Sequence, residues 1–97
     1  MNQSTKLRMS YKDCEHIRDW FQFVEPQRRT DVDLKLHKRI TQLVGVWEKS
    51  KNSEGIMFLR RPEAELVGRW FLMVPKVVRG KPDEDTYKTI ASYLSQS

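Results

Sequence analysis

The chain has 97 residues, of which 38% are hydrophobic and 32% charged, and its formal net charge at pH 7 is +5. This length predicts a single domain spanning 1–97, and the composition excludes a disordered chain. No apolar run approaches the roughly 20 residues of a membrane span, and the polar first ten residues lack the apolar core of a secretory signal.

Residues 1–9 are polar with two cations, which predicts a flexible basic N-terminal arm. A first helix is expected to begin at Ser10, because its hydroxyl can cap the helix and Asp13 can complete a capping box. The helix is expected to end before Pro26, whose ring disfavours helical conformation in the preceding residue. The apolar side chains recur at helical spacing and form one face: Tyr11, Cys14, Ile17, Phe21 and Val24.

The second helix has the strongest pattern in the sequence. Thr30 supplies the cap, and Asp31 and Asp33 complement the positive end of the helix dipole. One face carries Leu36, Ile40, Leu43 and Trp47. The short connection at 26–29 predicts that the first two helices are antiparallel neighbours.

The longest apolar run lies within residues 62–75, and two interpretations remain open for it. Pro62 and the glutamates after it favour the start of a helix, which we prefer for the first half of the stretch. The alternative is a short β-hairpin around residues 56–74, in which 67–74 pairs with 56–60. Periodicity alone does not decide between them.

A last helix is expected from about Asp83, with Tyr87, Ile90, Ala91 and Leu94 on one face. No internal repeat or low-complexity segment is evident. The predicted fold is therefore mainly α, a small single domain of about four helices, with the hairpin at 56–74 as an α+β alternative.

The chemistry-bearing residues do not form a catalytic or metal-binding pattern. Cys14 and His16 are two positions apart, so on a helix they point to nearly opposite sides. With His37 they are the only nitrogen and sulfur ligands of the kind zinc prefers, and a structural zinc site normally needs four. The acidic clusters are explained by helix starts. We therefore expect a protein that is not an enzyme and binds neither a metal nor a cofactor.

The single cysteine excludes an intramolecular disulfide and is typical of a reducing compartment, so a cytoplasmic location is expected. No membrane association is expected.

The basic residues favour a polyanionic partner. Nucleic acid is the commonest such partner, and distributed cations would contact its phosphates without strong sequence readout. The sequence does not distinguish DNA from RNA. The candidate nucleic-acid-binding residues are Arg28, Arg29, Lys35, Lys38, Arg39, Lys51, Arg60 and Arg61, and Lys76, Arg79 and Lys81 form a candidate second patch.

The alternative is a small inhibitor or adaptor that docks on a larger, acidic protein surface. Arginine and aromatic residues are the favoured anchors of such contacts. An exposed tryptophan among Trp20, Trp47 and Trp70 would favour this function. A homodimer formed through the central apolar stretch is a third alternative.

Overall fold

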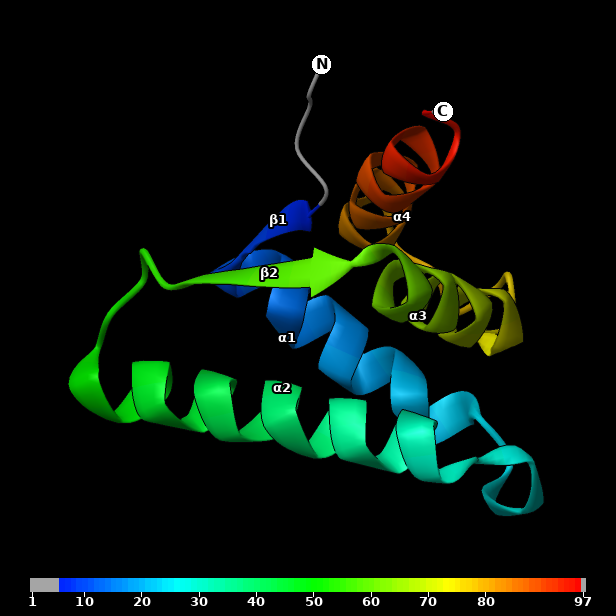
Figure 1. Ribbon diagram of the computed structural model, residues 1–97, viewed down its shortest axis with the longest axis horizontal. Coiled ribbons are helices and arrows are strands. Elements are labelled where there is room, and N and C mark those ends of the chain that lie inside the picture. Colours follow the sequence, from blue (N-terminus) through cyan, green and yellow to red (C-terminus); the bar gives the residue numbers. More distant parts are fainter. Residues whose placement is uncertain (1–5, 97) are drawn as a thin grey trace.

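The computed structural model describes residues 6–96 (Figure 1). In chain order the elements are β1 (Lys6–Ser10), α1 (Tyr11–Trp20), two 3-10 turns (Phe21–Phe23 and Pro26–Arg28), α2 (Asp31–Ser50), β2 (Ile56–Arg60), α3 (Arg61–Met73) and α4 (Lys81–Leu94). The prediction of a mainly α domain with four helices and a short β element is confirmed.

The first described residues form a strand and not a flexible arm. β1 pairs antiparallel with β2, so that Leu7 lies opposite Leu59 and Met9 lies opposite Met57. These four side chains are buried in the core. The arm prediction for residues 6–9 is therefore wrong, because two apolar residues at alternating positions give this polar stretch one buried face. Residues 1–5 lie outside the described part of the chain.

The central stretch is helical as far as Met73, whereas its sequence favours a helix only for its first half. Pro62 lies in the first turn of α3, and the Arg60 backbone N–H donates to Glu63 at 2.8 Å. The alternative pairing of 56–60 with 67–74 is wrong, since β2 pairs with β1 instead. β1 lies about fifty residues before β2 in the chain, so a local sequence pattern does not predict that the two strands pair.

The predicted starts of the first two helices are confirmed, whereas the last helix begins at Lys81 and not at Asp83. Ser10 and Thr30 both close capping boxes, with Asp13 and Asp33 respectively. α1 ends at Trp20, earlier than the limit set by Pro26, and the chain continues in a 3-10 turn. α1 packs against α2, as the short connection predicted (Figure 1).

The chain consists of two strand–helix–helix units that match when the numbering is shifted by fifty. β1, α1 and α2 correspond to β2, α3 and α4. The expectation of no internal repeat is therefore wrong. Eight identical pairs mark the repeat between 6–44 and 56–94: Glu15 and Glu65, Trp20 and Trp70, Phe21 and Phe71, Val24 and Val74, Arg29 and Arg79, Asp33 and Asp83, Lys38 and Lys88, and Ile40 and Ile90.

The strand register shows how the two units are related. Arg8 lies opposite Phe58, which is its own counterpart in the repeat, and the other pairs are arranged evenly about this one. An approximate twofold axis therefore passes between Arg8 and Phe58. We call the β1–β2 pair the ribbon.

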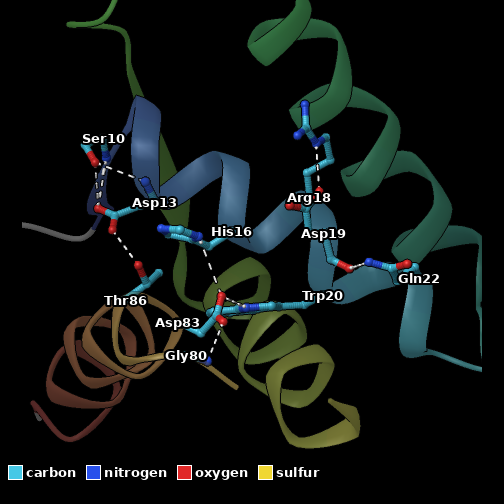
Figure 2. A network of polar contacts seen from close by, with 10 residues as sticks. All are labelled: Ser10, Asp13, His16, Arg18, Asp19, Trp20, Gln22, Gly80, Asp83 and Thr86. Carbon is cyan, nitrogen blue, oxygen red and sulfur yellow. Dashed lines mark hydrogen bonds and ion pairs between the residues drawn. The ribbon is translucent and has the colours of Figure 1, made fainter. Parts of the chain in front are cut away.

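The two units exchange hydrogen bonds across this axis. The indole N–H of Trp20 donates to Asp83 of the second unit at 3.0 Å, and that of Trp70 donates to Asp33 of the first, also at 3.0 Å. Figure 2 shows the first of these bonds, with His16 directed at the same Asp83 carboxylate. The core is thus shared by the two units.

Candidate nucleic-acid interface

The ribbon has one buried face and one exposed face. In both strands exposed and buried residues alternate, beginning and ending with an exposed one. This is the two-residue period of a strand that covers a core on one side. The exposed side chains, which we call the ribbon face, are Lys6, Arg8, Ser10, Ile56, Phe58 and Arg60.

The two ends of the ribbon face differ in chemistry. Lys6 lies opposite Arg60 at one end, and Ser10 lies opposite Ile56 at the other. Arg8 and Phe58 are paired in the middle, and the Phe58 side chain is 53% exposed. One end therefore carries two cations, and the other end is neutral and partly apolar.

Helices on both sides add cations next to the ribbon face. Arg39 of α2 and Glu63 of α3 line a hollow together with Lys6, Phe58 and Arg60. The Glu63 carboxylate in this hollow bonds the Arg39 guanidinium at 3.0 Å, so it is already engaged by a cation. A second hollow beside β1 is lined by Lys6 and by Lys88 of α4.

The structure brings together only some of the residues proposed from the sequence. Arg39 and Arg60 line the same hollow. Lys35 and Lys38 are exposed on α2. Arg28 precedes α2 and pairs with Glu25 at 3.1 Å, whereas Lys51 follows the other end of this helix. A helix of 20 residues is about 30 Å long, so Arg28 and Lys51 cannot belong to one compact patch.

Two of the proposed arginines bond the backbone of the protein itself. The Arg29 guanidinium donates to the carbonyl oxygen of Val24 at 2.9 Å and lies 4.5 Å from the Phe21 ring centroid. Arg61 donates to the carbonyl oxygens of Leu94 and Gln96 at the end of α4. These contacts give Arg29 and Arg61 a structural role.

The candidate second patch is also largely engaged. Arg79 repeats the contacts of Arg29, because it donates to the Val74 carbonyl oxygen at 2.9 Å and lies 4.4 Å from the centroid of Phe71. Lys81 pairs with Asp85 at 3.4 Å. Lys76 is exposed in the connection between α3 and α4.

The ribbon face contains residues that the sequence interpretation missed. The sequence places Lys6 and Arg8 in a flexible arm, and places Phe58 only in the alternative hairpin. The available signal was the alternation of Leu7 and Met9 with cations, together with Met57 and Leu59 at the matching positions of the repeat.

The buried titratable groups serve the core. Burial raises the pKa of the Cys14 thiol to about 12, so the thiol stays protonated at neutral pH and is no nucleophile. Burial also lowers the pKa of His37, whose ring stacks on Phe21 at 4.1 Å. For Asp33, burial pushes the pKa up, but hydrogen bonds from Thr30 and Trp70 outweigh it, and the net shift is downward.

The described residues 6–96 contain no group of three or more His, Cys, Asp or Glu side chains that could hold a metal ion. Among the same residues, no helix is long and apolar enough to cross a membrane. The three tryptophans are all buried, so none of them is an exposed anchor for a protein partner.

The chain matches no protein-family model, no curated protein and no solved structure.

Proposed function

We propose that this protein is a non-catalytic nucleic-acid-binding protein that uses the ribbon face. The observation that supports the proposal is the set of cations near one exposed aromatic ring, Phe58: Lys6, Arg8, Arg39 and Arg60. Lys88 adds a cation beside Lys6 in the neighbouring hollow. Cations neutralise phosphates, and an exposed aromatic ring adds contact with bases.

The number of cations sets the expected salt dependence. Each phosphate that is neutralised on duplex DNA contributes about −0.9 to the slope of log affinity against log salt concentration. Arg39 already pairs with Glu63, so four such contacts by the other cations predict that a fourfold rise in salt weakens binding by about 150-fold. A protein held by apolar contacts would show little of this dependence.

The experiment is fluorescence anisotropy with labelled single-stranded and duplex DNA and RNA at two salt concentrations about fourfold apart. Arg8→Glu with Arg60→Glu should abolish binding, since both side chains lie on the ribbon face. The control is Lys76→Glu, an exposed position beyond the far end of α3, about 20 Å along that helix from Arg60. Absence of binding by the unaltered protein at low salt, or equal loss with Lys76→Glu, would overturn the proposal.

A second candidate function rests on four exposed apolar residues at the end of α3 and in the connection that follows it, which we call the apolar patch. Leu72, Met73, Val77 and Val78 have exposed fractions of 58%, 41%, 96% and 51%. Their counterparts in the first unit are Gln22, Phe23, Gln27 and Arg28, so the patch is a property of the second unit alone. Exposed apolar residues that lie close together in the chain are candidates for a protein-docking site.

Cations border this patch. Arg69 lines hollows together with Leu72 and with Met73, and Lys76 precedes Val77 in the chain. This arrangement favours docking on an acidic protein surface. The test is chemical cross-linking of this protein to an acidic partner protein. Replacing Val77 and Val78 by Asp should abolish the cross-linked product and leave nucleic-acid binding unchanged. Cross-linking that survives both substitutions would rule out the patch as its docking site.

A further inference from the structure

We propose that the ribbon enters the major groove of duplex DNA and reads a site whose two halves differ, with guanine under its arginines and thymine under Phe58 and Ile56. This inference rests on the proposed nucleic-acid binding and specifies its ligand. It follows from the dimensions of the ribbon and from the unlike side chains that the two units place on it.

The dimensions of the ribbon fit the major groove. Its two strands lie about 4.8 Å apart, and the groove is about 12 Å wide, which admits a two-stranded ribbon with its side chains. Five residues in each strand extend about 17 Å. At about 3.4 Å per base pair, this length covers about five base pairs.

The scaffold repeats, but the side chains that would contact bases do not. Across the approximate twofold axis Lys6 is replaced by Ile56, Arg8 by Phe58, and Ser10 by Arg60. On the buried side of the ribbon the corresponding residues stay apolar, with Leu7 matched by Met57 and Met9 by Leu59. The two units have thus kept the same core and differ in the exposed chemistry.

These unlike side chains have different preferences among bases. Arginine donates two hydrogen bonds to the O6 and N7 atoms of guanine, which both face the major groove. Apolar side chains contact the C5-methyl group of thymine in the same groove. Arg8 and Arg60 therefore favour guanine, and Phe58 and Ile56 favour thymine. Arg60 pairs with Lys6 at one end of the ribbon, and Ile56 pairs with Ser10 at the other. The guanine-rich half of the DNA site is therefore expected at the end with Lys6 and Arg60.

Contacts to phosphates can remain symmetric while the base contacts differ. Lys38 of α2 and Lys88 of α4 are identical counterparts in the repeat, and both are exposed. The approximate twofold axis relates the positions of these two lysines, and symmetry-related cations suit the two backbones that border a groove. Phosphate contacts fix the position of a protein on the duplex, and base contacts supply the specificity.

The same features disfavour other nucleic acids. The major groove of duplex RNA is deep and narrow, and side chains cannot read it. Proteins that hold single strands stack successive bases on several aromatic rings. On the ribbon face Phe58 is the one aromatic residue. We therefore expect duplex DNA to bind more tightly than duplex RNA or single strands of the same sequence.

The test begins with selection of bound sequences from a duplex DNA pool with a randomised central segment. The best duplex is then altered one atom group at a time. Replacing guanine by 7-deazaguanine removes the N7 acceptor, and replacing thymine by deoxyuridine removes the methyl group, while the backbone charge stays the same. A whole bidentate base contact corresponds to about 5- to 150-fold in affinity. Because 7-deazaguanine removes one of its two hydrogen bonds, we expect losses in the lower part of this range.

Variants assign each loss to a side chain. In Arg8→Ala, which removes the guanidinium, the effect of 7-deazaguanine at one position should disappear, while salt-dependent binding through the remaining cations persists. In Phe58→Ala, the effect of deoxyuridine should disappear. Both side chains are exposed, so the fold should be retained, and circular dichroism checks this. Lys76→Ala should leave both effects intact.

The outcomes separate the two proposals. Salt-dependent binding with no enriched sequence, or with equal affinity for single strands, would overturn the groove-reading inference and leave the proposed function standing. An enriched palindrome would overturn the asymmetry. Lack of binding to every nucleic acid would overturn both.

Discussion

The indole N–H groups of Trp20 and Trp70 donate to equivalent aspartates. These two acceptors differ in burial. Asp33, the acceptor of Trp70, is 7% exposed, whereas the side chain of Asp83, the acceptor of Trp20, is 23% exposed. A hydrogen bond to a charged group contributes more when water cannot replace it. The pair therefore allows one interaction to be compared in two environments.

We expect Trp70→Phe to lower the free energy of unfolding by about 1.5–3 kcal/mol, because it leaves the Oδ1 atom of a buried carboxylate without its donor. Trp20→Phe is the matched control and should cost less, since the Asp83 carboxylate retains access to water and the nearby His16. Urea unfolding at neutral pH measures both. Equal losses would show that burial of the acceptor does not set the strength of these bonds.

The lowered pKa of Asp33 predicts a pH dependence of stability. A carboxylate whose pKa is lower in the folded state binds protons less readily when folded, so it stabilises the protein above its unfolded pKa, near 3.9. This contribution is lost as the pH falls through the lower, folded pKa. We expect Asp33→Asn to lose less stability than the unaltered protein between about pH 5 and pH 2, as measured by urea unfolding. A steeper loss in the variant would contradict this assignment.

At the level of elements, the helices could be predicted from the sequence and the ribbon could not. Ser10 and Thr30 predict the starts of their helices, because a capping box needs only two residues three positions apart. The ribbon depends on residues about fifty positions apart, and each strand has only five residues. Leu7 and Met9 were too few to distinguish a strand from a polar tail.

The candidate site was hard to predict for the same reason, because its contacts join residues that are far apart in the sequence. Arg29 and Arg61 were predicted to contact phosphates, and their contacts with backbone carbonyls depend on tertiary structure. Arg39 and Arg60 were predicted individually, but their placement in one hollow required the fold. The repeated Trp-Phe-x-x-Val sequence at 20–24 and 70–74 was visible from the start and would have revealed the two units.

The segment that joins α2 to β2 gives a prediction at the same scale. A Cβ atom at Gly55 would lie 2.3 Å from the ring of Trp47, which is itself buried against Tyr11. We expect Gly55→Ala to lower the free energy of unfolding by about 1–3 kcal/mol, the usual cost of overpacking.

Gly45 provides the matched control, because a Cβ atom there meets no atom within 4 Å and the residue lies inside α2. Gly45→Ala should raise the free energy of unfolding by about 1 kcal/mol through its higher helix propensity. Thermal unfolding of the two variants gives opposite shifts in Tm if both arguments hold. A neutral Gly55→Ala would mean that Trp47 repacks at little cost.

At the level of the whole molecule, the two units form one core. β1 pairs with β2, and each unit donates a tryptophan hydrogen bond to the other. Trp20 also packs edge-on against Phe71 of the second unit at 5.0 Å, and Phe21 packs against Trp70 at 4.8 Å. Neither unit could bury these aromatic rings alone.

The covalent connection between the units should therefore be dispensable once the protein has folded. We expect that cleavage at a protease site placed within 52–54, in the exposed loop before β2, leaves the two fragments associated through their shared core. Size-exclusion chromatography of the cleaved protein should give one peak at the position of the intact chain. Dilution should lower its Tm, because association of the two fragments is now bimolecular. Fragments that separate at micromolar concentration would contradict this view. The loop would then be required to hold the halves together, and the ribbon would depend on the continuous chain.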